Sequence, residues 1–490
     1  MPTGYSANDL VLLLPEIVLT TGLLVVLVAD LFTGRSRQHW LGWLTIGVLV
    51  ATAVPIVALS GHATTAARGL LAVDGFGAFF KLLFVLAAAI TVLISRQYLE
   101  VEQARPGEYY FLVLCATLGM MVMAAGIDLI TLFIGLETMA VSFYVLTGFL
   151  RPNRRSNEAA IKYFVLGAFS LGILLYGMSL VYGLSGTTRL REVAVALATQ
   201  SDSLALKLAV VLVAAGMAFK IAAVPFHMWA PDVYEGAPTP ITAFLSVGSK
   251  AASFAMLLRL LLEGLPAMAP EWRGLFYVLA VLSMTVGNIA AITQGNVKRM
   301  LAYSSIAHAG YILIGIVTAT PRGVTAMLVY LMIYAFMQMG AFGVLALLRR
   351  RDVVGDELKD LSGLFFRRPL AAFAMLVFML SLGGIPPTAG FMGKFWLFSA
   401  AIEAGYVWLA VIGVLNSAIS LYYYVRVVVF MWMREELESA SVHPSPGVAV
   451  ALTVAVAATI IIGVYPAPLF ELAEASAKTL GMAPRVLSLR

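Results

Sequence analysis

The chain has 490 residues, of which 61% are hydrophobic and only 12% are charged. A soluble domain normally carries about 25% charged residues, so this composition indicates a polytopic membrane protein. The net charge of +6 does not indicate nucleic-acid binding, because most of the Lys and Arg residues cluster in short loops between apolar runs. A single cysteine excludes an intrachain disulfide framework, and the sequence has no thiol pair or cluster typical of a metal site.

Long apolar stretches predict an all-α membrane protein. A transmembrane helix needs about 20 mainly apolar residues, and on this criterion we predict about fourteen spans. They cover residues 10–31, 40–60, 74–95, 108–125, 127–150, 159–184, 204–229, 239–263, 274–294, 299–319, 322–348, 369–402, 406–433 and 446–470. The first lacks a basic segment and a cleavage site before it, so we expect a retained span. Residues 188–200 are too short to span and predict an interfacial helix.

The loop charges predict the orientation. Loops that follow odd-numbered spans hold most of the arginines, including Arg151, Arg154, Arg155 and Arg349. Basic loops normally stay in the cytoplasm. With an even number of spans, both termini are then expected on the periplasmic side of a bacterial inner membrane.

Two spans contain helix-breaking prolines. Span seven contains Pro225, and span twelve contains the run SLGGIPPTAGFMGK. Proline removes a backbone donor, and the freed groups must be satisfied by protein or by a water-lined cavity. Paired breaks five spans apart indicate an inverted repeat around a transport site. We therefore predict helices 1–3 in residues 1–107, one repeat in 108–265 (spans 4–8), a second in 266–435 (spans 9–13), and a last span with its tail in 436–490.

Four ionisable residues interrupt apolar spans: Glu137, Lys220, Lys250 and Lys394. A charge at bilayer depth costs at least about 2.5–3.5 kcal/mol, so such residues usually face a polar interior and carry function. Glu137 follows Asp128, which begins its span, by a helical distance of about 13 Å. Together the four residues predict a proton path.

We expect Glu137 to pair with Lys220. At about 5 Å and an effective dielectric of about 20, their attraction is about 3 kcal/mol, enough to control whether the lysine holds its proton. A purely structural ion pair between two helices is the alternative.

Other polar residues have two interpretations. His308 is either a proton relay or a packing residue, and His227 beside the first break either relays protons or bonds freed carbonyls. Lys81 and Asp74 predict an ordinary interfacial pair. The run Tyr422–Tyr424 predicts a packing or interfacial cluster, with a relay hydroxyl as the alternative.

The segment FKIAAVPFHMWAPDVYEGAPTPITAFLSVGSKAA (219–252) resembles the signature of the antiporter-like subunits of proton-pumping NADH:quinone oxidoreductase, respiratory complex I. Three other stretches are similar to the same family: LFIGLETMAVSFYVL, GNIAAITQGNVKRMLAYSSIAHAGYILIG and LSLGGIPPTAGFMGKFWLFSAAIEAG. Within this family, the lysine at position 394 resembles the branch that has no glutamate at this position, and the short segment after the last span resembles a branch without a long C-terminal lateral helix.

This resemblance implies fourteen helices, two inverted five-helix units and a central hydrophilic axis. It also implies key roles for Glu137, Lys220, Lys250 and Lys394. The implied partners are other membrane subunits and a peripheral arm with FMN and iron–sulfur clusters, which act on NADH and quinone, with no cofactor on this chain. Two alternatives remain: a subunit of a multisubunit cation/proton antiporter, or a non-pumping structural subunit.

Overall fold

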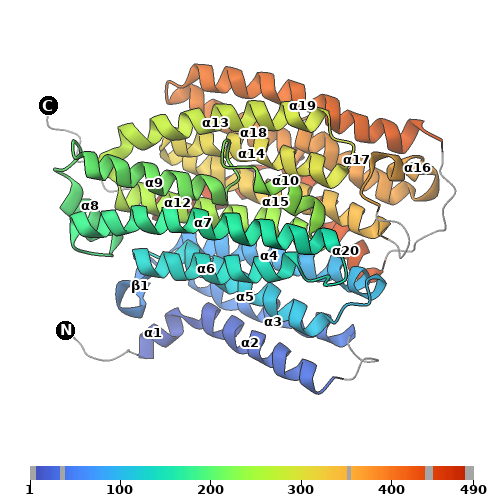
Figure 1. The fold of residues 1–490 in the computed structure, drawn as a ribbon, viewed down its shortest axis with the longest axis horizontal. Coiled ribbons are helices and arrows are strands. Elements are labelled where there is room, and N and C mark those ends of the chain that lie inside the picture. Colours follow the sequence, from blue (N-terminus) through green and yellow to red (C-terminus); the bar gives the residue numbers. More distant parts are fainter. Residues whose placement is uncertain (1–6, 34–38, 350–354, 436–444, 481–490) are drawn as a thin grey trace.

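The computed structural model describes residues 7–33, 39–349, 355–435 and 445–480. Its long helices run side by side along one axis (Figure 1). Twelve of the described helices are long and apolar enough to cross a membrane. The predicted class, an all-α polytopic membrane protein, is confirmed. The count of fourteen spans and the inverted relation of the two repeats remain predictions.

The N-terminal segment contains three long helices and one feature that we did not predict, a short hairpin. Its elements are α1 Ala7–Leu12, α2 Leu14–Leu31, α3 His39–Leu59, strands β1 Thr64–Ala66 and β2 Leu71–Val73 joined by the 3-10 turn η2 Ala67–Gly69, and α4 Gly75–Val101. The strands pair antiparallel, with Thr64 opposite Val73. Strands of three residues are too short to show an alternating pattern in the sequence.

The next segment contains the first break. Its elements are α5 Pro106–Ala125, α6 Leu129–Thr147, α7 Arg154–Ser185, α8 Leu190–Leu197, α9 Leu204–Lys220, α10 Trp229–Gly236, α11 Thr239–Phe244, the π-helical turn η3 Leu245–Ser249, α12 Lys250–Leu258 and the π-helical turn η4 Arg259–Gly264. Helix α8 occupies the place of the predicted interfacial helix. Capping side chains begin several of these helices: Asp128 accepts from the backbone N–H of Ile130 at 2.9 Å at the start of α6.

The last segment contains the second break. Its elements are η5 Pro266–Met268, α13 Ala269–Ile292, α14 Val297–Thr318, α15 Pro321–Leu348, η6 Leu358–Leu361, α16 Leu364–Arg367, α17 Pro369–Gly383, α18 Ala389–Glu403, α19 Val407–Met433, α20 Pro446–Val464 and α21 Ala467–Thr479. We predicted a span to residue 470, but α20 ends at Val464 and a separate helix, α21, follows. Thr479 of α21 accepts a hydrogen bond at 2.8 Å from the backbone N–H of Phe76, at the start of α4.

Both predicted breaks are present. Helix α9 ends at Lys220 and α10 begins only at Trp229. Within this gap, the backbone N–H of Val224 donates to Ser283 Oγ at 2.9 Å. Helix α17 ends at Gly383 and α18 begins at Ala389. Side chains of neighbouring helices therefore satisfy part of the freed backbone, as a membrane interior requires.

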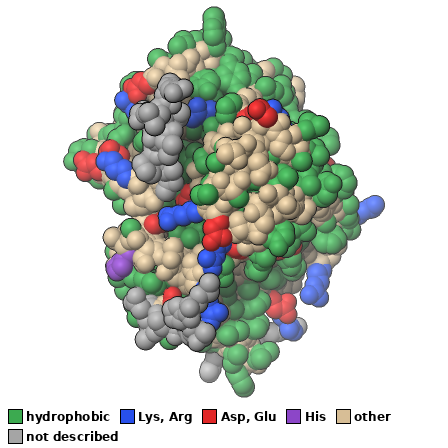
Figure 2. Space-filling model, turned by 90° about the vertical axis from the view of Figure 1, so that its left-hand side faces the viewer, with side chains coloured by type: hydrophobic (Ala, Val, Ile, Leu, Met, Phe, Trp, Pro, Cys, Tyr) green, Lys and Arg blue, Asp and Glu red, His purple; other side chains and the backbone are tan. Residues whose placement is uncertain are grey.

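The segments that carry the predicted site lie at the centre of the bundle. Helices α14 and α15 and residues 239–264 are almost wholly buried, whereas α7 and α20 turn most of their apolar side chains outward. A helix that is apolar on all sides can lie in the interior of a protein or against lipid. Figure 2 looks onto the end of the molecule that carries β1 and α8, and hydrophobic side chains dominate its flanks while charges gather in a few groups.

Candidate functional site: a buried row of ionisable side chains

Lys250 lies in the middle of the bundle. It is the first residue of α12, directly after the π-helical turn η3, and only 2% of it is exposed. Its Nζ donates to Ser305 Oγ at 2.5 Å and to the backbone carbonyl of Ser305 on α14. The ring of Tyr334 lies 5.7 Å away. π-helical turns are frequent at functional sites, because the extra residue re-aims the following side chains.

His308 lies on the same helix as Ser305, three residues later. Its Nδ1 is 2.7 Å from the hydroxyl of Tyr330, and its Nε2 is 3.1 Å from the hydroxyl of Tyr424. The Tyr424 hydroxyl also lies 2.5 Å from Ser304 Oγ. Every one of these groups except the imidazole is a hydroxyl, which both donates and accepts. The histidine is therefore held in a network that can pass a proton in either direction.

Lys394 lies beside the second break. Its Nζ donates to the carbonyls of Leu382 and Gly383 at 3.0 and 3.1 Å and to Ser417 Oγ at 2.8 Å. The carbonyls are those that the end of α17 leaves free, so the lysine satisfies them. Its Nζ also lies 4.9 Å from the ring of Tyr311, which is 5.6 Å from the His308 ring. Lys394 is thus one aromatic ring away from His308.

Lys250 is also one aromatic ring away from His308. The Tyr334 ring that Lys250 contacts is 5.2 Å from the His308 ring. The structure therefore brings Lys250, His308 and Lys394 together in one row, with the histidine between the two lysines.

Lys220 on α9 and Glu137 on α6 are not hydrogen-bonded to each other. Lys220 is the last residue of α9 and only 4% exposed, and its Nζ has no hydrogen-bond partner among the described residues. Its nearest ring is that of Tyr144, at 5.9 Å. Glu137 is half-buried on α6, and its Oε1 also lacks a partner in the described part of the chain. Both residues are described, and no ion pair within 4.0 Å joins them. The expected electrostatic pairing at about 5 Å therefore stays a prediction.

His227 stays outside the row. It lies half-buried in the first break, and its Nδ1 has no hydrogen-bond partner among the described residues. Its backbone carbonyl accepts from the N–H of Ala230 at 2.9 Å. A role in relay or in satisfying freed carbonyls therefore stays a prediction.

Sequence reasoning missed most of the neutral groups of the network. Tyr424 was expected to be a packing or interfacial residue, with a relay hydroxyl as the alternative. Its hydroxyl bonds His308, whereas its neighbour Tyr422 is 59% exposed. Ser304 and His308 are four residues apart in the run YSSIAH, so helical spacing could have placed them on one face. Nothing in the sequence indicates that α19 would bring Tyr424 to that face.

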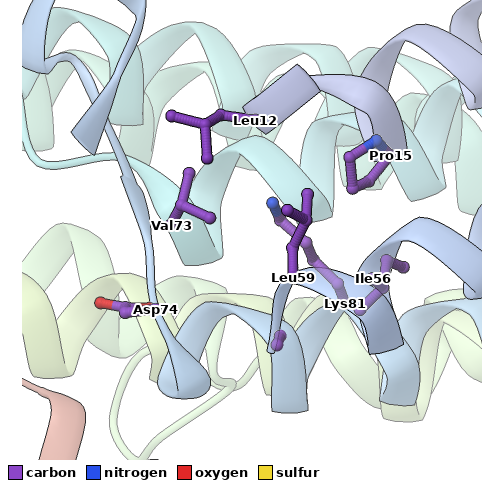
Figure 3. Close-up of a pocket in the computed structure, with 8 residues that line it drawn as sticks. Leu12, Pro15, Ile56, Leu59, Val73, Asp74 and Lys81 are labelled. Carbon is purple, nitrogen blue, oxygen red and sulfur yellow. The ribbon is translucent and has the colours of Figure 1, made fainter. Parts of the chain in front are cut away.

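The predicted pair of Lys81 and Asp74 is wrong. Lys81 Nζ binds Glu16 Oε1 of α2 at 2.6 Å. Asp74 instead accepts from Arg259 at 2.9 Å, and Arg259 also binds Glu263 at 2.8 Å. Figure 3 shows Lys81 and Asp74 at separate places along the small cavity between α1, α3 and α4. Asp74 and Lys81 are seven residues apart, which is about 10 Å along a helix axis. Each therefore binds a partner on another element, Arg259 and Glu16.

Among the residues that the structure describes, no group of three or more His, Cys, Asp or Glu is placed to hold a metal ion. The row has instead the kinds of group that proton transfer uses: amines, an imidazole and hydroxyls. Lys250 is bonded to Ser305, and His308 is bonded to Tyr330 and Tyr424. Lys394 is bonded to Ser417, and aromatic rings separate these three sets.

Comparisons with known proteins identify the family of the chain. The family model described as NADH:quinone oxidoreductase/Mrp antiporter, TM, matches residues 125–420. NADH-quinone oxidoreductase subunit N of Trichlorobacter lovleyi is 48% identical over 480 residues, which cover 97% of this chain and 98% of that protein.

Two solved structures have the same fold. A chain of respiratory complex I from Thermus thermophilus with bound aureothin is 33% identical, with a TM-score of 0.80, and the match covers 94% of this chain and 99% of that one. A chain of the Mrp complex from a Dietzia species is 22% identical, with a TM-score of 0.82 and 98% of each chain covered. At that identity, the second likeness shows the fold alone. The chain belongs to the antiporter-like membrane-subunit family of NADH:quinone oxidoreductase, and within it to the subunit N group.

Proposed function

We propose that this chain is the proton-translocating membrane subunit of an NADH:quinone oxidoreductase, and that Glu137, Lys220, Lys250, His308 and Lys394 form its proton path. The observation that carries the proposal is the buried row in which His308 lies between Lys250 and Lys394. Buried lysines without an ion-pair partner are costly, and a structural role does not require them.

Each group of the row has a suitable role. The amine of Lys250 holds a proton and donates it to Ser305, whose hydroxyl can also return one. His308 receives a proton at one ring nitrogen and releases one at the other, through the hydroxyls of Tyr424 and Tyr330. Lys394 accepts the proton at the second break, where the carbonyls of α17 hold its charged form.

Repulsion between neighbouring charges couples the protonation of the groups in the row. A protonated lysine about 10 Å from the His308 ring, at an effective dielectric of about 20, disfavours a second positive charge there by about 1.7 kcal/mol. A proton on Lys250 therefore favours release of the proton from His308 toward Lys394.

Glu137 and Lys220 provide the control at the start of the path. Their charges are close enough to interact, but no direct ion pair holds them. At a separation of about 5 Å their attraction would be about 3 kcal/mol, so a side-chain movement toward or away from this distance would strengthen or weaken it by part of that amount. Either position of the carboxylate thus sets a different proton affinity for Lys220.

The proposal includes the setting of the chain. It lies in a bacterial inner membrane with both termini on the periplasmic side, and its two antiporter-like repeats span residues 108–265 and 266–435. The chain itself carries no cofactor. Its partners are the other membrane subunits and, through them, the peripheral arm, which carries FMN and iron–sulfur clusters and oxidises NADH with quinone as acceptor.

A subunit of a cation/proton antiporter is the second candidate, because the Mrp chain has the same fold. Extraction of the chain in mild detergent distinguishes the two. Co-purification of flavin and iron–sulfur subunits supports the proposal, and their absence from an otherwise intact assembly contradicts it. A non-pumping structural subunit is disfavoured by the buried lysines.

The site is tested by Glu137→Gln in the whole complex, with Glu403→Gln as control. Glu403 is a surface glutamate that pairs with Arg322 at 2.6 Å and is half exposed. Glu137→Gln should preserve assembly and strongly reduce both proton pumping and coupled NADH:quinone turnover in membrane vesicles, whereas the control should pump normally. Normal pumping by Glu137→Gln would contradict the proposed controlling role of Glu137.

A further inference from the structure

A second group of buried charges lies at the end of the molecule where α4 and α15 finish and α14 begins. Lys298, the second residue of α14, is at its centre and only 2% exposed. Its Nζ donates to the carbonyl of Ala237, between α10 and α11, at 2.7 Å. Asp356 Oδ2, after α15, lies 3.8 Å from the same Nζ. We call Lys298, Ala237 and Asp356 the Lys298 cluster.

Charges from several neighbouring elements act on Lys298. Besides Asp356, these are Glu102 of α4, Glu235 of α10 and Arg349 after α15. Glu102 is occupied by Arg349 at 2.5 Å, and Glu235 by Arg299 at 3.0 Å. Lys298 is thus left with a carbonyl and a carboxylate that is beyond hydrogen-bond distance. This is a poor arrangement for a fixed structural cation, which normally has a close carboxylate partner when it is buried.

Helix α14 connects this cluster to the row. Lys298, Ser305 and His308 are separated by seven and three residues, so they lie along one side of the helix. Two turns, about 10.5 Å, separate Lys298 from Ser305. The part of α14 between Lys298 and Ser305 lies beside α10, and the Tyr234 hydroxyl of α10 is 3.5 Å from Ser305 Oγ. Ser305 in turn accepts from Lys250.

We propose that Asp356 and Lys298 take up protons at this end of the molecule and deliver them along α14 to Lys250. This inference rests on the proposed proton-pumping function. The Asp356 carboxylate takes a proton from water and gives it to the neutral amine of Lys298. The amine passes it to the hydroxyls of Tyr234 and Ser305 through a bridging water, and Ser305 passes it to the neutral amine of Lys250. One proton moves at each step, and each donor is left ready for the next.

The environment of Asp356 supports this role. Burial raises the pKa of its carboxyl above the ordinary 3.8, against the lowering effect of Lys298 and Arg349. An acid whose pKa is closer to neutrality takes up and releases protons more evenly. The alternative is a structural lock, in which Lys298 only fixes the junction of α10 and α11.

The experiment compares variants of the whole complex in inverted membrane vesicles. Lys298→Met removes the titratable group, and Lys298→Arg keeps the charge but cannot release a proton in the useful pH range. Arg299→Gln is the matched control, because Arg299 is the adjacent basic residue and makes two ion pairs, but is 31% exposed. Proton pumping, NADH oxidation and the amount of assembled complex are measured for each.

We expect both Lys298 variants and Asp356→Asn to lower pumping at least about tenfold. The loss of an acid–base group typically costs about a hundredfold or more, but here water replaces part of its function. A small weak acid such as azide should restore pumping in Asp356→Asn, because it can replace the missing proton donor. If Asp356 only fixed the structure, azide would have no effect. Arg299→Gln should pump normally.

Normal pumping by Lys298→Arg, or by Asp356→Asn, would overturn the inference in favour of the structural lock. If Lys298→Met does not assemble, Asp356→Asn with azide decides. Lys250→Arg is measured in parallel. If it loses pumping while the Lys298 and Asp356 variants do not, only the uptake route is wrong. If Lys250→Arg also pumps normally, the proposed function itself fails.

Discussion

Tyr424→Phe tests whether the hydroxyl network around His308 carries protons. The substitution keeps the ring, which packs against Tyr423 with a centroid distance of 4.4 Å, and removes only the oxygen. Two buried atoms then lose a partner: His308 Nε2 at 3.1 Å and Ser304 Oγ at 2.5 Å. An unsatisfied buried polar group costs about 1–3 kcal/mol.

That cost sets the expected size of the effect. In the proposed path His308 needs its proton acceptor held in place, so a large part of the cost should appear in the barrier to proton transfer. A rise of 1.4–2.8 kcal/mol, within this range, slows a step by about 10–100-fold. The complex should still assemble, because the ring and its apolar contacts are unchanged.

The assay is proton pumping by inverted membrane vesicles, measured by fluorescence quenching and normalised to assembled complex. Tyr422→Phe is the control, because Tyr422 is on the same helix but 59% exposed. We expect the control to pump at the wild-type rate. A wild-type rate in Tyr424→Phe, or an equal loss in both variants, would refute the reasoning that the hydroxyl is part of the path.

Three further predictions concern charge. Lys220→Arg should impair turnover as Lys220→Ala does, because arginine keeps the charge but releases no proton near neutral pH; a fully active arginine variant in NADH:quinone assays would make Lys220 a fixed cation. Proton gradients formed by the complex in liposomes should be equal with and without sodium, because a protonated Lys250 about 5 Å from a metal cation repels it by about 3 kcal/mol; strict sodium dependence would contradict this. Burial raises the pKa of Asp232, but hydrogen bonds from Lys162 and Arg299 outweigh burial and hold the pKa below the ordinary 3.8. Its ionised form then stabilises the protein above about pH 4, and this stability is lost as the pH falls through the lowered pKa. Asp232→Asn should therefore reduce the unfolding temperature of the purified complex at pH 7, with a difference that shrinks below about pH 4; an equal difference at both pH values would exclude this origin.

Much of the site could be predicted because its signals are local. An apolar run of sufficient length specifies a membrane helix whatever surrounds it, and a lysine in the middle of such a run is costly in any fold. Lys250 and Lys394 were therefore recognisable, as were the breaks at Pro225 and after Gly383. The hairpin of β1 and β2 and the helix α21 were missed, because short elements carry too few residues to show a period.

The pairings were not predictable, because they depend on which helices meet. Lys81 was expected to bind Asp74 on its own helix, but Glu16 and Arg259 approach from α2 and η4 and bind them separately. Tyr424 reaches His308 only because α19 packs beside α14. The sequence by itself determined that this is a helical membrane protein with broken spans and costly charges at depth, since length, hydropathy and proline act within one segment. Tertiary packing alone decided that Lys250, His308 and Lys394 form one row, because hydrogen bonds between helices depend on distances that no single segment contains.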